Sequence, residues 1–94
     1  MRILLTLEYD GTDYAGWQRQ LNGPSVQEAL EDALRRATGT DTRITGASRT
    51  DAGVHALGQR AHFDTASSIP PDRYPLVLGT LLPRDIAVIQ SVAV

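Results

Sequence analysis

Along this chain of 94 residues, segments with the apolar period of a strand alternate with segments that have the apolar spacing of a helix. The order of these segments is compatible with few folds. Residues 2–10 alternate apolar and polar side chains, which predicts a strand with one better apolar face. Beyond a loop, apolar residues recur at steps of three and four over residues 26–37, which predicts an amphipathic helix. Ser25 and Glu28 have the spacing of a capping box at its start, and Gly39 is expected to end it.

The rest of the chain continues the pattern with three further strands and one further helix. Residues 42–48 weakly predict a second strand, and residues 57–65 predict a third. A shorter helix is expected to open at Pro70 and to end at Pro83. Residues 86–94 predict a fourth strand that is apolar on both faces.

The order β-α-β-β-α-β predicts an α+β fold of the ferredoxin-like type, with two helices on one face of a four-stranded antiparallel sheet. The opposite face stays open, and we expect Leu4, Ile89 and Ala93 to lie on it. Such a face would leave apolar side chains in water. The domain is therefore expected to pack against more of its own chain or against a second copy, so a homodimer is predicted.

Composition excludes several classes of function. The chain has no cysteine, so disulfides and thiolate metal sites are excluded, and a cytoplasmic location is expected. No apolar run is long enough to span a membrane, and the first residues turn acidic too early for a signal peptide. A net charge of −2 predicts no general affinity for nucleic acid, although all nine cationic residues are arginine.

A short polar stretch between the second and third predicted strands holds the residues best suited to chemistry. Arg49, Asp51, Gly53 and His55 fall within seven positions. An aspartate in a walled pocket can act as a base or as a nucleophile, and an arginine beside it can meet a phosphate. Spacing alone is equally compatible with a plain connection in which Asp51 caps a turn. For His55, a hydrogen-bonded structural role is favoured over proton transfer.

Other candidate sites are weaker. Trp17 lies in the first loop, where packing over a sheet edge is favoured over stacking on a base. No cluster of histidine and carboxylate residues has metal-ligand spacing, and no glycine-rich loop precedes a helix as a nucleotide-phosphate site requires.

Three motifs resemble, in order and spacing, those of the tRNA pseudouridine synthase A family. Residues 49–56 resemble its catalytic motif, residues 9–20 its N-terminal signature, and residues 82–86 the segment that closes its first half. The helix at residues 26–34 resembles the family's first helix. The resemblance covers essentially the whole chain.

The resemblance implies that Asp51 is the catalytic residue and that uridine at nucleotides 38–40, in the anticodon stem-loop of tRNA, becomes pseudouridine. Whether the carboxylate attacks the sugar or removes a proton from it stays open. The target base must leave its stem, and Arg49 is the candidate to fill the gap. No cofactor and no metal are implied. RNA contacts are expected from Arg49, Trp17, Gln18, Arg19, His55 and Gln59.

Family members carry a second, similar domain, so the chain is expected to be an N-terminal half that is inactive or nearly so alone. Two other functional classes share this fold. An acylphosphatase-type enzyme would need a phosphate-binding first loop, but Asp10 and Asp13 make that loop acidic. A non-catalytic RNA-binding module would carry several aromatics on its central strands, which offer only Tyr9 and Phe63.

Overall fold

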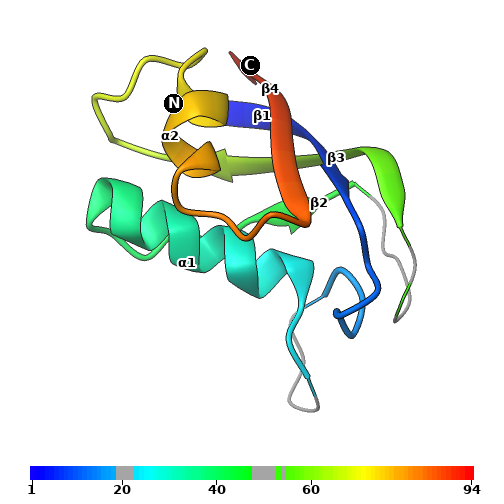
Figure 1. The fold of residues 1–94 in the computed structure, drawn as a ribbon. Helices are drawn as coiled ribbons and strands as arrows, with labels where there is room; N and C mark the ends of the chain where they lie inside the picture. The colour runs from blue at the N-terminus through cyan, green and yellow to red at the C-terminus, as the bar shows by residue number, and fades with distance from the viewer. Residues whose placement is uncertain (19–22, 48–52, 54) are drawn as a thin grey trace.

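A computed structural model describes residues 1–18, 23–47, 53 and 55–94 of the chain. Four antiparallel strands form one sheet in the order β2-β3-β1-β4, and Figure 1 shows both helices on the same side of it. The elements are β1 (Arg2–Tyr9), α1 (Val26–Thr38), β2 (Thr45–Gly46), β3 (Ala56–Asp64), α2 (Tyr74–Gly79) and β4 (Ile86–Ala93). The predicted ferredoxin-like α+β fold is confirmed. Within the described part, no helix has the length and apolar character needed to cross a bilayer.

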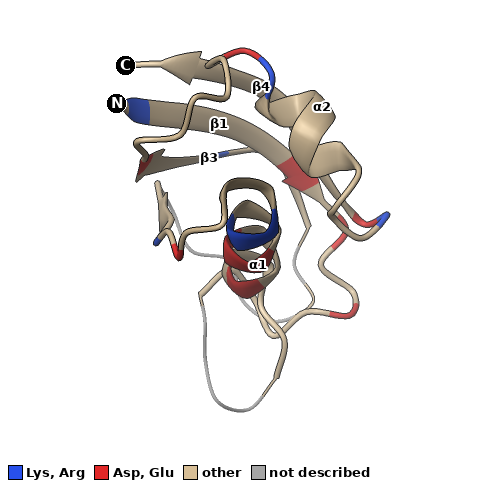
Figure 2. Ribbon diagram, turned by 90° about the vertical axis from the view of Figure 1, so that its left-hand side faces the viewer, with Lys and Arg blue, Asp and Glu red and all other residues tan. Residues whose placement is uncertain are grey.

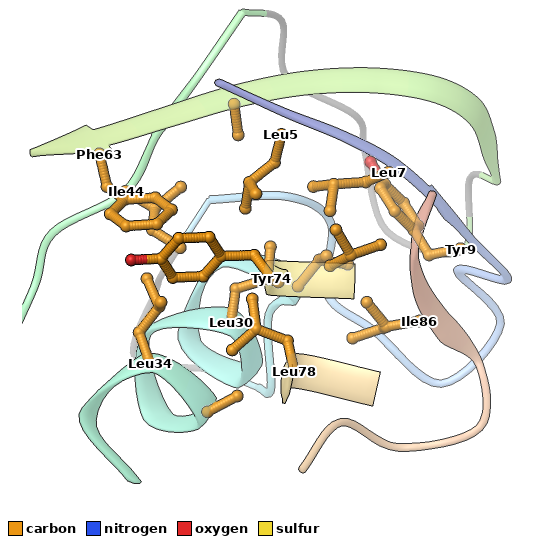
Figure 3. Close-up of a cluster of buried hydrophobic side chains, with 14 of the residues drawn as sticks. Leu5, Leu7, Tyr9, Leu30, Leu34, Ile44, Phe63, Tyr74, Leu78 and Ile86 are labelled. Atoms are coloured by element: carbon orange, nitrogen blue, oxygen red, sulfur yellow. The ribbon is translucent and has the colours of Figure 1, made fainter. Parts of the chain in front are cut away.

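The core lies between the sheet and the two helices, as Figure 3 shows. Alternate residues of β1 are buried, as their periodicity predicts, and Leu5 and Leu7 point toward the helices. The rings of Phe63 on β3 and of Tyr74 pack in a T-shaped arrangement, with centroids 5.2 Å apart. The apolar face of each strand is turned to the helices, and no helix of the described residues covers the other face of the sheet.

Helix α1 begins and ends where the sequence predicts. Ser25 Oγ accepts the Glu28 N–H at 3.1 Å, a cap that is worth about 1 kcal/mol. Gly39 takes a left-handed conformation with φ of 76°, and its N–H donates to the backbone carbonyl of Arg35 at 2.8 Å. Figure 2 shows acidic and basic residues along this helix, and the bases at its end suit the helix dipole.

The predicted strand at residues 42–48 is mostly wrong, because β2 contains only Thr45 and Gly46. The backbone of Ile44 is bound by side chains of α1 instead of by a neighbouring strand. Its N–H donates to Glu31 Oε2 at 2.9 Å, and its carbonyl accepts from Gln27 Nε2 at 3.0 Å. Because both polar groups are already satisfied, this stretch needs no ladder partner.

The expected composition of the open sheet face needs one correction. A register shift in the β1–β4 pairing lies between Thr6 and Leu7, so the alternation along β4 breaks near Ile89. Val92 consequently pairs with Leu4 on the open side, whereas Ala93 lies opposite the inward-facing Ile3. Ile89 and Val92 are exposed, and the expectation for Ala93 is wrong.

Helix α2 is shorter than predicted at both ends. The Arg73 N–H donates to the Pro70 carbonyl at 3.0 Å, so the prolines form a turn before the helix. The helix ends at Gly79, well before Pro83. Glycine is a poor helix former, and the Leu78 carbonyl beside it accepts N–H groups from the chain that follows.

Candidate active site

Three stretches that lie far apart in the sequence meet beyond the end of β1. The Asp10 N–H donates to the Asp85 carbonyl at 2.9 Å, just before β4. The Gly53 N–H donates to the Tyr14 carbonyl at 3.1 Å. The buried Gly11 N–H donates to His55 Nδ1 at 2.8 Å. The loop after β1 therefore binds both the segment that enters β3 and the segment that enters β4.

His55 has the structural role that was favoured for it. Because Nδ1 accepts the Gly11 N–H, the neutral ring carries its proton on Nε2. The carboxylate of Asp10 lies 3.2 Å from the same Nδ1. Hydrogen bonds from the Thr12 hydroxyl and N–H lower the pKa of Asp10. Asp10 thus stays ionised in neutral solution, and its carboxylate holds Thr12, two residues further along the same loop.

Tyr14 joins this loop to β4 through its side chain. Its hydroxyl donates to Asp85 Oδ1 at 2.7 Å, and its own N–H donates to the Gly11 carbonyl at 3.0 Å. Burial, and then the bond to Asp85, raise the pKa of the Tyr14 hydroxyl, so it remains a donor at all ordinary pH values. Neither Tyr14 nor Asp85 was predicted as a site residue. Their only signal was membership in the first and last motifs.

Trp17 covers the edge of the sheet, as favoured from the sequence. Its ring is 3% exposed and stacks on Tyr9, with centroids 6.5 Å apart. The indole also lies against Gly46 of the edge strand β2, so closely that a Cβ there would be 2.6 Å from Cε2. The first loop is therefore fixed to the strand that precedes residue 48.

The predicted site residues fall into three groups. Asp51, Arg49 and Arg19 lie outside the described residues. Gln18 and His55 are exposed, which leaves both accessible to RNA. Trp17 and Gln59 are buried, and in this arrangement neither presents a surface to RNA. Gln59 pairs with Leu7 across the β3–β1 ladder.

A cleft of about 480 Å³ opens beside the joined loops. Its charged and apolar lining includes Glu8, Asp10, His55, Leu57, Arg84 and Asp85. A larger groove of about 1060 Å³ runs along α1, but there Arg35 is already paired with Asp32 at 2.6 Å. Among the described residues, no three histidine or carboxylate side chains lie close enough to hold a metal ion. The smaller cleft, where the motifs meet, is the better candidate site.

Comparison with known proteins gives consistent matches. The family model described as tRNA pseudouridine synthase matches residues 6–94. A protein of Caldicellulosiruptor saccharolyticus named tRNA pseudouridine synthase A is 55% identical over 86 residues, covering 92% of this chain and 35% of the relative. Proteins of the same name from Clostridium kluyveri and Myxococcus xanthus are 55% and 52% identical, covering 95% and 99% of this chain. The chain spans 36% and 35% of the length of those two relatives.

Proposed function

Since the chain belongs to the tRNA pseudouridine synthase family, we propose that it carries the catalytic aspartate of an enzyme that makes pseudouridine in the anticodon stem-loop of tRNA. Asp51 is the proposed catalytic carboxylate. The N1–C1′ bond of the target uridine breaks, the uracil turns while it is held, and C5 bonds to C1′. C5 then gives up its proton and N1 gains one, so the product is an isomer of uridine. The carboxylate acts either on the sugar carbon as a nucleophile or on a sugar proton as a base. A tRNA substrate agrees with the expected cytoplasmic location.

One observation carries the proposal beyond family membership: the loops of three family motifs converge at one end of the sheet. Hydrogen bonds join Asp10 to Asp85, Tyr14 to Gly53 and Gly11 to His55. The cleft beside them offers carboxylates, a guanidinium, an imidazole N–H and the exposed side chain of Leu57. A flipped nucleoside has hydrogen-bond donors, acceptors and an apolar face, so this mixed lining suits it better than it suits a bare phosphate.

Roles at the RNA follow from the same proposal. Arg49 fills the space that the flipped base leaves, because a guanidinium both stacks on bases and reaches phosphate. The exposed Gln18 and the Nε2–H of His55 contact the RNA backbone or the base. Trp17 contributes indirectly, by fixing the first loop to β2.

Activity is tested in a chimera in which this chain replaces the matching segment of the Caldicellulosiruptor saccharolyticus relative. We expect the chimera to form pseudouridine in an anticodon stem-loop RNA, and the 94-residue chain alone to be inactive or nearly so, because a trapped uracil needs a pocket walled on all sides. The relative itself is the positive control, and pseudouridine is measured by mass spectrometry of digested RNA. An inactive chimera beside an active relative contradicts the proposal.

The open sheet face is proposed to meet a second domain of the enzyme and, in its absence, a second copy of the chain. Leu4 and Val92 lie side by side there, and Val92 is 46% exposed. We expect the 94-residue chain to self-associate at high concentration in sedimentation velocity, and Val92→Glu to weaken this association. Leu76→Glu, on the exposed side of α2, is the matched control. A monomer at all concentrations would count against the proposal.

A further inference from the structure

We propose that Tyr14 and Asp85 form a positioning pair that fixes where the chain leaves the segment carrying Asp51. The inference rests on the proposed function, since it assigns the pair a purpose in that reaction. Tyr14 does not line the smaller cleft, so its role in the pair needs no contact with the substrate. The effect of the pair passes through Gly53, two positions after Asp51, and through His55, four positions after it.

Tyr14 is held at three points. Its N–H donates to the Gly11 carbonyl at 3.0 Å, its carbonyl accepts from Gly53 at 3.1 Å, and its hydroxyl donates to Asp85 at 2.7 Å. The hydrogen bond from the Tyr14 hydroxyl to Asp85 restrains the side chain. The side chain in turn restrains the Tyr14 backbone carbonyl, which accepts the Gly53 N–H. The Ala15 N–H, in the same peptide unit as this carbonyl, donates to the Pro24 carbonyl at 2.7 Å, so the hydroxyl adds a restraint from the β4 side to one that already comes from the start of α1.

Asp85 anchors the loop a second time through its backbone. Its carbonyl accepts the Asp10 N–H at 2.9 Å, and the next residue of the loop, Gly11, donates to His55. Gly53 has φ of 77°, a conformation that a residue with a side chain rarely adopts. Gly53 and His55 are thus both hydrogen-bonded to the loop that follows β1. Asp85 binds that loop at two points, the Asp10 N–H and the Tyr14 hydroxyl.

Position at this point matters because the connection to Asp51 is short. Two residues span at most about 7 Å of chain, so the position of Gly53 limits where Asp51 can lie. Reacting groups must be held closely, and a misplacement of about 1 Å can cost up to 10²-fold in rate. Loss of the Tyr14–Asp85 bond should therefore lower kcat and leave KM for the RNA nearly unchanged.

The first test needs no activity. Amide hydrogen exchange is measured by NMR on the 94-residue chain and on Tyr14→Phe, Asp85→Ala, Asp85→Asn and the double variant Tyr14→Phe/Asp85→Ala. We expect the Gly53 and Gly11 amides to exchange about tenfold faster in the Phe and Ala variants, the change expected for losing one hydrogen bond. The double variant should add little. Asp85→Asn keeps an oxygen acceptor and should restore most of the protection.

Tyr74→Phe is the matched control, because its buried hydroxyl has no hydrogen-bond partner among the described residues. It should leave Gly53 and Gly11 unchanged. Amides of the β1–β3 ladder report global unfolding and should be unchanged in every variant. Gly53 exchange that is unaffected by Tyr14→Phe, or that rises only together with the ladder amides, would overturn the inference.

The second test measures pseudouridine formation by the chimera. Tyr14→Phe, which leaves the lining of the smaller cleft intact, should lower kcat about tenfold with KM within about twofold. Asp85→Ala should lower kcat at least as much, and Asp85→Asn should retain more of kcat than Asp85→Ala. Equal kcat in Tyr14→Phe and in the parent would overturn the inference even if exchange at Gly53 had risen. An inactive parent chimera would instead overturn the proposed function, while the amide measurement would still decide whether the pair holds Gly53.

Discussion

Replacing Asp51 with asparagine is expected to lower pseudouridine formation by the chimera at least about 10³-fold, within the range that a positioned catalytic acid or base contributes. Asparagine keeps the size of the side chain and one of its two acceptor oxygens, but it can neither attack the sugar nor accept a proton from it. RNA affinity should change little, because binding depends on many other contacts. The measurements are single-turnover rates on an anticodon stem-loop RNA and a filter-binding titration with the same RNA.

The control for this change is Asp72→Asn, because Asp72 is exposed in the turn before α2 and does not line the smaller cleft. It should keep the parent rate. Activity of the Asp51 variant above about a tenth of the parent would remove Asp51 from the catalytic role, since that loss is smaller than the loss expected for a catalytic group. Equal losses of rate and of RNA binding would point instead to a disturbed fold.

Gly46→Ala is expected to lower the free energy of unfolding of the 94-residue chain by about 2 kcal/mol or more, as overpacking of a buried site does. A Cβ at this position would lie 2.6 Å from Cε2 and 2.9 Å from Cζ2 of Trp17. The indole cannot move aside easily, because it is buried and stacked on Tyr9. The cost is purely steric, since Gly46 is not among the glycines with positive φ.

Urea denaturation followed by circular dichroism measures this effect. Gly58→Ala is the matched control within a strand, because nothing lies within 4 Å of its added Cβ, and it should be neutral or slightly stabilising. Adding Trp17→Phe to Gly46→Ala should recover part of the loss, because the smaller ring relieves the overlap. A midpoint for Gly46→Ala equal to that of Gly58→Ala would show that Trp17 does not pack against β2 in solution.

The elements that were predicted well are those with local signals. The helix α1 was bounded correctly because its cap at Ser25 and its stop at Gly39 are set within one turn of the helix. The strands β1 and β3 were found because their alternation is undisturbed and decides which side chains enter the core. The second strand was overextended because the partners of Ile44 are Gln27 and Glu31, side chains more than ten residues away.

The candidate site likewise has features that the sequence predicted and features that only the structure revealed. Motif order and spacing were enough to identify the family, and with it Asp51 as a candidate, because those are properties of a linear pattern. They did not reveal the link from Asp85 through Tyr14 to Gly53, since hydrogen bonds between distant backbone groups leave no periodicity in a sequence. Nor did they reveal that Trp17 requires a glycine at position 46, or that a register shift brings Val92 to the open face.

The sequence by itself thus determined the order of strands and helices, the ends of α1 and the family, because periodicity, capping and motif spacing act over a few neighbouring residues. Only the tertiary structure decided how the loop after β1 is joined to Gly53, His55 and Asp85, because each of those contacts depends on where the folded sheet brings two remote segments together.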